Sequence, residues 1–149
     1  MKTLFTPAWY RKAQKDPTLF KRTFETYDRQ LSRVRPKLSM NVRRLSTYSF
    51  HDCMVKEVRL LENQTVVLYL RGYCRLRNGG SGVEGLHVIA MKGVRETTLS
   101  PECVGGYWLY EELSASGKQL RLSALLTEPT TLISFKFTDA KVTVGKRAK

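Results

Sequence analysis

The sequence predicts an α+β fold in which N-terminal helices pack on a mainly antiparallel β-sheet or an open barrel. Two observations lead to this fold class. Apolar side chains recur at helical spacing before residue 50, whereas from residue 54 onward most segments alternate apolar and polar residues as strands do. We expect one domain over residues 1–149, with a basic helical part (1–49), a β-rich part (50–145) and a basic tail (146–149).

The helical part contains start and stop signals. A short helix is expected after Pro7, and Asp16 followed by Pro17 is a favourable start for a longer one. Arg35 precedes a proline and should end that helix, because the residue before proline is disfavoured in the helical region. Residues 37–47 are compatible with a second short helix. The longer helix carries an apolar stripe that predicts docking against a sheet: Phe20, Phe24, Tyr27 and Leu31.

The β-rich part divides into strands at its turn residues. Residues 54–61 and 65–77 predict an antiparallel pair, and residues 86–91 predict a third strand. Residues 132–138 and 141–144 predict a last strand or a last pair.

The clearest hairpin signal lies in residues 106–115 and 118–127, with Ser116 and Gly117 as the connection. In that register Glu112 faces Arg121 as an opposite-charge cross-strand pair. Trp108 and Tyr110 would then share one face of the hairpin with Arg121.

Positive charge is the outlier in the composition. The chain has 26 Lys and Arg against 13 Asp and Glu, a net charge of +13. Residues 1–50 hold 12 basic and 3 acidic side chains, so they carry +9 of that charge. Such a field favours nucleic acid, an anionic membrane surface or an acidic protein as a partner, and it also keeps a protein soluble without serving any partner.

The cysteines and the hydropathy pattern indicate a compartment. Cys53, Cys74 and Cys103 are widely spaced and odd in number, which favours free thiols in a reducing environment. A run such as residues 86–91 is far shorter than the roughly 20 apolar residues that a membrane span needs. We therefore expect a cytoplasmic protein without a membrane span, and homo-oligomers are compatible with the sequence.

Alternating aromatic and basic residues mark one face of the strand at 65–77. On a strand, alternate residues point the same way, so aromatic rings for base stacking and guanidinium groups for phosphates would share a surface. The same residues also suit the solvent face of a sheet or a face that contacts a protein. The stripe consists of Tyr69, Arg71, Tyr73, Arg75 and Arg77.

His51 and Asp52 stand at the entrance to the first long strand and suggest metal chemistry. A metal-dependent hydrolase centred on them would need further ligands, and Glu111 and Cys53 are candidates for a loose site. The alternative is structural, with Asp52 capping a turn and His51 hydrogen-bonding the loop backbone. Cys53 and His51 do not predict a catalytic dyad, because closeness in sequence alone does not bring a thiol and an imidazole into hydrogen-bond contact. We expect no metal, no cofactor and no catalytic residue.

Three short segments carry a family resemblance: Phe5–Tyr10, Phe50–Cys53 before a strand, and Tyr107–Glu112. They resemble an uncharacterised family of small bacterial proteins known only as a domain of unknown function. The resemblance implies an N-terminal helical part followed by a β-rich part that opens with a His-Asp pair, and it supplies no catalytic residues. A similar His-Asp pattern at a strand opening occurs in immunity-type proteins, which bind and block a toxin, so toxin binding enters as an analogy.

Three functions remain open from the sequence. The leading expectation is a non-enzymatic protein that binds a protein partner, the second is a nucleic-acid-binding protein with a basic-aromatic surface, and the third is the hydrolase-like enzyme. The expected binding residues are Tyr69, Arg71, Tyr73, Arg75, Trp108, Tyr110, Glu112, His51 and Asp52.

Overall fold

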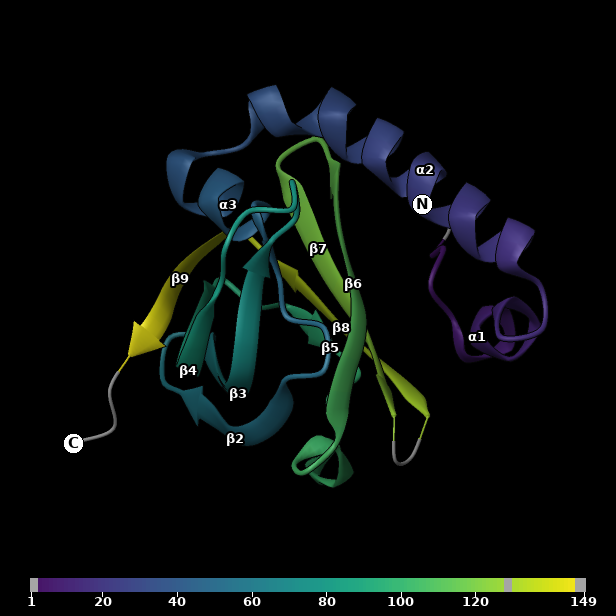
Figure 1. The fold of residues 1–149 in the computed structure, drawn as a ribbon. Helices are drawn as coiled ribbons and strands as arrows, with labels where there is room; N and C mark the ends of the chain where they lie inside the picture. Colours follow the sequence, from purple (N-terminus) through teal and green to yellow (C-terminus); the bar gives the residue numbers. More distant parts are fainter. Residues whose placement is uncertain (1–2, 128–129, 147–149) are drawn as a thin grey trace.

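N-terminal helices lie against a curved antiparallel sheet (Figure 1), which confirms the predicted α+β class. The structure, a computed structural model, describes residues 3–127 and 130–146. Within those residues the chain forms three α-helices, two short 3₁₀-helices and nine strands. Their bounds are α1 Pro7–Ala13, α2 Pro17–Val34, η1 Arg35–Lys37, α3 Met40–Leu45, β1 Tyr48–Ser49, β2 Met54–Leu61, β3 Thr65–Leu76, β4 Val83–Lys92, β5 Glu96–Thr97, η2 Pro101–Cys103, β6 Tyr107–Ser116, β7 Gln119–Thr127, β8 Thr131–Phe137 and β9 Asp139–Lys146.

Each α-helix begins at a side chain that accepts a hydrogen bond from the helix backbone. Asp16 Oδ1 accepts from the backbone N–H groups of Thr18 and Leu19 at 3.1 and 3.2 Å, so the predicted start of α2 is confirmed. α2 ends at Val34, directly before the Arg35-Pro36 pair. None of the helices in the described part of the chain is long and apolar enough to cross a membrane.

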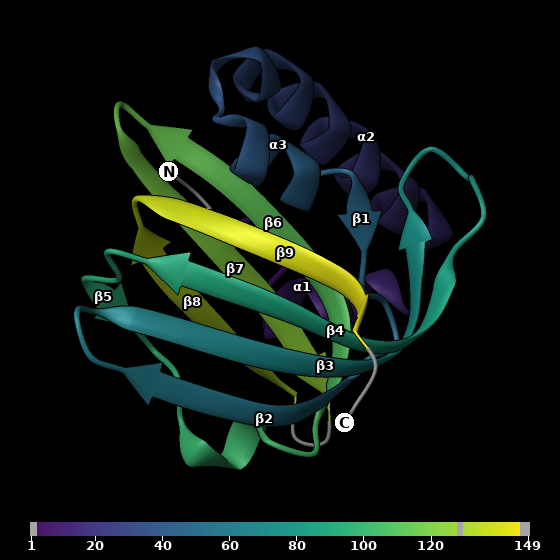
Figure 2. The same ribbon diagram turned by 90° about the vertical axis from the view of Figure 1, so that its left-hand side faces the viewer.

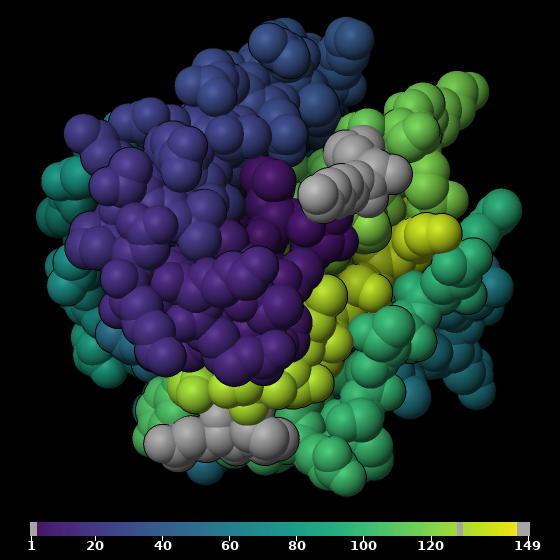
Figure 3. All heavy atoms as spheres, turned by 90° about the vertical axis from the view of Figure 1, so that its right-hand side faces the viewer, coloured from purple at the N-terminus to yellow at the C-terminus, as the bar shows by residue number. Residues whose placement is uncertain are grey.

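α2 docks on the outer face of β6 through its aromatic stripe. Tyr27 is buried, whereas Phe20, near the start of the helix, is 37% exposed. The ring centroids of Phe24 and Tyr110 lie 5.0 Å apart in an edge-to-face arrangement, which aromatic pairs prefer. The Tyr27 hydroxyl accepts a hydrogen bond from the backbone N–H of Leu113 on β6 at 2.8 Å. Figure 3 shows α1 and α2 spread over this side of the molecule.

The strands form one sheet that bends back on itself (Figure 2). Its order is β5-β8-β7-β6-β2-β3-β4-β9, with β1 beside β3. The bend lies between β6 and β2, which share only the Met54–Tyr107 position among the described residues. The half that contains β3 and β4 therefore faces the half that contains β6 and β7 across a common core. The sheet is not closed, and α3 lies against β9.

The β6–β7 hairpin forms, but the predicted register is wrong by two residues. Ser116 pairs with Gln119, which leaves Gly117 and Lys118 as the loop. Gly117 has a φ of 61°, a conformation that glycine adopts without steric cost. As a consequence Arg121 lies opposite Ser114, and the expected pairing of Arg121 with Glu112 does not occur.

A β-bulge in β6 changes which of its side chains face the core. The register shifts between Trp108 and Tyr110. Trp108 faces the interior between the sheet halves together with Glu111, whereas Tyr110 packs against the helices on the outer side. The predicted common face of Trp108 and Tyr110 is therefore wrong, because a bulge breaks the two-residue alternation of a strand.

The last two strands, β8 and β9, follow each other in the chain but do not pair with each other. β8 pairs with β7 and β5, whereas β9 pairs with β4 in the other half of the sheet. The predicted last segment is thus two strands that connect the halves, and not a hairpin.

His87, on β4, is a buried polar link between neighbouring strands. Its side chain is 0% exposed. Its Nε2 lies 2.7 Å from the Gly72 carbonyl oxygen, and its Nδ1 accepts from the Gly145 N–H at 3.0 Å. The carbonyl needs a donor and the amide needs an acceptor, so this geometry fits a neutral imidazole with its proton on Nε2.

We predict that Tyr27→Phe lowers the free energy of unfolding by about 1–3 kcal/mol at neutral pH, because it leaves the buried Leu113 N–H without an acceptor. Burial raises the pKa of Tyr27 from 10.0 to about 12. Wild type should therefore lose stability between pH 10 and 12, where only the unfolded chain ionises at this residue, at about 1.4 kcal/mol per pH unit.

Chemical denaturation across that pH range tests both effects. The difference between wild type and Tyr27→Phe should shrink as the pH rises, because the variant cannot ionise there. Tyr107→Phe is the matched control, since the Tyr107 side chain is 41% exposed. A Tyr27→Phe effect as small as that of the control would contradict the role of this hydrogen bond.

Candidate functional site

A groove between α2, the turn after β1, the end of β3 and β6 brings several of the predicted site residues together. Its volume is about 550 Å³. A second hollow of about 570 Å³ lies beside η1 and the β6–β7 hairpin, and none of the predicted site residues lines it. The first groove is therefore the candidate site, and its lining residues are Phe24, Ser49, His51, Asp52, Tyr73, Arg75 and Tyr110.

The His51-Asp52 pair forms the middle of a tight turn. The Cys53 N–H donates to the Phe50 carbonyl at 2.9 Å, which closes the turn. Asp52 has a φ of 69°, in the left-handed region that aspartate tolerates better than most residues. Its N–H donates to the Trp108 carbonyl at 2.7 Å, so the turn is fastened to β6.

The imidazole of His51 is held in a defined orientation. Its Nδ1 lies 2.6 Å from the Leu109 carbonyl oxygen and must carry a proton to bond it, because a carbonyl only accepts. The ring stacks on Tyr110 at a centroid distance of 5.0 Å and an angle of 14°. Nε2 faces Asp52 Oδ2 at 3.4 Å, where a full ion pair forms only when the ring is protonated.

β3 contributes an arginine and a tyrosine to the groove. The Arg75 guanidinium lies over the Tyr73 ring, 5.3 Å from its centroid, in a cation–π arrangement. The Tyr73 hydroxyl accepts from the Gly82 N–H at 2.9 Å, so this side chain also fastens the loop between β3 and β4. Tyr73 is 41% exposed and Arg75 is exposed.

The rest of the basic-aromatic stripe divides between the surface and the interior. Arg71 is exposed and Tyr69 is half-buried, with the Arg59 guanidinium 5.0 Å from the Tyr69 ring centroid. Arg77 follows the end of β3 and turns inward, where its Nη2 pairs with Glu111 at 3.2 Å and its guanidinium lies 5.2 Å from the Tyr27 ring centroid. The stripe is therefore continuous only from Tyr69 to Arg75.

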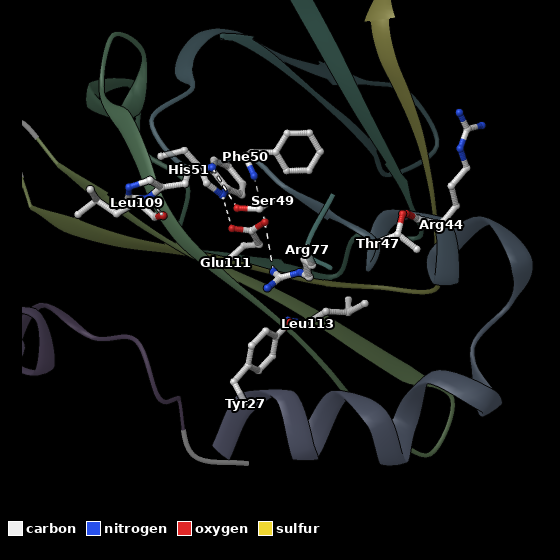
Figure 4. A network of polar contacts seen from close by, with 11 residues as sticks. Tyr27, Arg44, Thr47, Ser49, Phe50, His51, Arg77, Leu109, Glu111 and Leu113 are labelled. Carbon is white, nitrogen blue, oxygen red and sulfur yellow. Dashed lines mark hydrogen bonds and ion pairs between the residues drawn. The ribbon is translucent and has the colours of Figure 1, made fainter. Parts of the chain in front are cut away.

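Glu111 lies in the interior and not in the groove (Figure 4). Its Oε1 accepts from the Phe50 N–H at 3.2 Å and pairs with Arg77, and its Oε2 accepts from the Trp108 indole N–H at 3.1 Å. The cavity beside it measures only about 10 Å³, space for about one water molecule at most. Glu111 is thus held by structural hydrogen bonds and an ion pair, so it cannot serve as a ligand in the expected loose metal site with His51.

Two of the predicted binding residues are fully or nearly fully buried. Trp108 is 0% exposed and Glu112 is 3% exposed. Glu112 Oε1 accepts from the backbone N–H groups of Leu4 and Phe5 at 2.9 and 3.1 Å, which fastens the segment before α1 to β6. Burial raises the pKa of Glu112, although these two N–H groups and the charge of Arg121 act in the opposite direction. Of the predicted Trp108, Tyr110 and Glu112 surface, Tyr110 alone reaches the groove.

The groove can bind through stacking and charge. Within the described residues no three His, Cys, Asp or Glu side chains lie close enough together to hold a metal ion. Burial raises the pKa of the Cys53 thiol to about 12, so the thiol stays protonated near neutral pH. What the groove offers is an aromatic wall of Phe24, His51 and Tyr110 beside the Arg75 guanidinium.

Sequence reasoning missed Phe24 and Ser49 as groove residues. Phe24 belongs to the predicted docking stripe of α2, and it fills both roles because it lies at the edge of the helix–sheet contact. Ser49 precedes the turn on β1, and its position depends on the pairing of β1 with the end of β3, which no local pattern indicates.

We predict that Asp52→Gly changes the free energy of unfolding by less than about 0.5 kcal/mol, because glycine adopts a φ of 69° readily. Asp52→Val should destabilise by about 1–2 kcal/mol, because a β-branched residue is strained there. Thermal unfolding of both variants makes the comparison, and equal effects would show that the turn does not impose this conformation.

Comparison with known proteins places these segments in a family. Residues 6–135, which include the helices, the His51-Asp52 turn and β6, match the family described as Protein of unknown function (DUF4085). The search of curated proteins found no match, and neither did the search of solved structures. The match covers most of the chain and agrees with the resemblance seen in its sequence, so the chain belongs to the DUF4085 family of proteins of unknown function.

Proposed function

We propose that the protein is a non-enzymatic binding protein and that its partner is another protein, held in the groove between α2 and β3. The observation that carries this proposal is the lining of the groove, in which four aromatic rings stand beside the exposed guanidinium of Arg75: those of Phe24, His51, Tyr73 and Tyr110. Aromatic side chains and arginine are the residues that most often dominate the energy of protein interfaces. Three free, buried cysteines support a reducing compartment such as the cytoplasm.

The groove suits a peptide segment with an acidic side chain next to an apolar or aromatic one. A carboxylate of the partner would pair with Arg75, whose guanidinium is exposed and makes no ion pair within the described residues. An apolar side chain would lie against Phe24 and Tyr110. The net charge of +13 would speed the approach of an acidic partner.

The surroundings of the two tyrosines favour a protein over single-stranded nucleic acid. Base stacking needs a free ring face, and guanidinium groups already lie over Tyr69 and Tyr73. Carboxylates also interrupt the positive surface. In the strand register, Glu57 on β2 lies directly opposite Tyr69, and Glu84 on β4 lies directly opposite Tyr73. Nucleic-acid binding is therefore our second proposal, supported by the charge and by the exposed Arg71.

The hydrolase expectation receives less support. Asp52 is the single carboxylate among the residues that line the groove, and Glu111 is engaged in the interior. A hydrolytic site of that kind would need a second acid or further metal ligands beside His51.

Selection from a random peptide library, followed by titration of the enriched peptide, tests the proposal. Arg75→Glu should weaken the binding of an enriched acidic peptide by about tenfold or more, because it turns an attraction into a repulsion. The matched control is Arg59→Glu, since Arg59 also lies over a tyrosine but outside the groove. Arg59→Glu should change the affinity by less than about twofold.

Parallel titrations with mixed-sequence single-stranded DNA across a salt series separate the two proposals. DNA binding that weakens steeply with salt, and that both arginine variants impair, would support nucleic acid. Failure to enrich any peptide, or equal losses in the two variants, would contradict a protein partner in this groove.

A further inference from the structure

A second cluster of polar residues lies on the outer face of β6, β7 and β8, away from the groove. The strand register places Ser114, Arg121 and Lys136 directly beside one another in a row across the three strands. Like charges that face each other on neighbouring strands destabilise a sheet. The facing positions of Arg121 and Lys136 therefore carry like charges, and an ion pair of Lys136 with Glu96, the next residue in the row on β5, offsets this repulsion on one side only.

A hollow of about 280 Å³ opens at this row. Its lining consists of Ser114, Ser116, Gln119, Arg121 and Lys136. Each of these side chains can donate a hydrogen bond, and the described residues that line the hollow include no carboxylate. Gln119 Nε2 makes only long contacts of 3.4 Å with two backbone carbonyls, so it can turn toward a better acceptor.

The guanidinium of Arg121 has an unused donor. Its Nη2 is buried and has no hydrogen-bond partner within the described part of the chain. A buried donor without a partner costs free energy, and guanidinium groups rarely remain unpaired. Arg121 also lines the hollow, and a guanidinium is the side-chain group that binds planar or tetrahedral oxyanions best.

Two carboxylates lie near the row and leave the hollow available. Glu96 pairs with Lys136 at 2.9 Å, but its side chain is 69% exposed, and such surface pairs contribute little to stability. The Glu112 carboxylate accepts hydrogen bonds from the Leu4 and Phe5 N–H groups. Among the described residues it forms no ion pair with Arg121 within 4.0 Å.

We propose that this hollow binds the phosphate group of a small phosphorylated molecule, or inorganic phosphate itself. Donors converge on it from three strands, which suits the several oxygens of a tetrahedral anion better than the two oxygens of a carboxylate. A dianion would also offset the repulsion between the positive charges of Arg121 and Lys136. The hollow is larger than a phosphate group and smaller than a typical drug-sized pocket, so it leaves room for a short organic part.

Thermal unfolding at constant ionic strength tests the proposal with inorganic phosphate, glycerol phosphate and acetate, each against chloride. Phosphate should raise the Tm of the wild type in a saturable manner, because it binds the folded chain and not the unfolded one. A larger rise with glycerol phosphate would identify a phosphate ester as the ligand, and an equal rise would identify the bare anion. Acetate at the same ionic strength should have little effect.

Three variants make the test specific. Arg121→Met keeps an aliphatic side chain, and it should abolish the phosphate response. Ser116→Ala changes an exposed residue, so it should fold normally and weaken phosphate binding by severalfold. Arg75→Met, in the groove, should leave the response unchanged, which separates this site from the proposed protein-binding site.

Chemical shifts of the Ser114 and Ser116 amides provide a direct measurement of the same site. They should move with phosphate in the wild type and stay fixed in Arg121→Met. An equal response to acetate, an undiminished response in Arg121→Met, or a response lost in Arg75→Met would overturn the proposal.

Discussion

The ion pair between the buried Glu111 and the half-buried Arg77 is the constraint on which the rest of the structure depends. Burial alone would lower the pKa of Arg77, but the adjacent carboxylate raises it, so the guanidinium stays charged beside Glu111. Glu111 also accepts hydrogen bonds from the Phe50 N–H and the Trp108 indole. One carboxylate thus joins the turn before β2, the bulge in β6 and the end of β3. A buried charge persists only when its partners are fixed, so this contact sets the positions of all three segments.

The groove follows from this arrangement. Because Glu111 and Trp108 point inward, the bulge turns Tyr110 outward, where it meets α2 and supports the imidazole of His51. The same turn that carries His51 is fastened to β6 through the Asp52 N–H. The outer face of β6 therefore serves two purposes along its length. Near the bulge it builds the aromatic groove, and toward the hairpin it presents Ser114 to the row of cations on β7 and β8.

The elements that local physics determines were predictable from sequence, and the contacts between distant segments were not. The start of α2 at Asp16-Pro17 and the two long strands around residues 62–64 follow from capping and alternation. The predicted register of the β6–β7 hairpin was wrong, because the register depends on which two residues form the loop. A shift of two residues keeps the same alternation of apolar and polar side chains, so the pattern does not reveal the error. The inward turn of Arg77 depends on a carboxylate 34 positions away, which no pattern near Arg77 could indicate.

A double-mutant cycle on Glu111 and Arg77 tests the central claim most directly. The free energy of unfolding would be measured for wild type, Glu111→Leu, Arg77→Leu and the double variant. Each single variant should lose about 1–3 kcal/mol, because it leaves one member of the pair without its partner, and the double variant should lose clearly less than the sum. Additive losses would contradict the account, since they would mean that the two residues stabilise the fold independently and that their ion pair does not organise the turn, the bulge and β3.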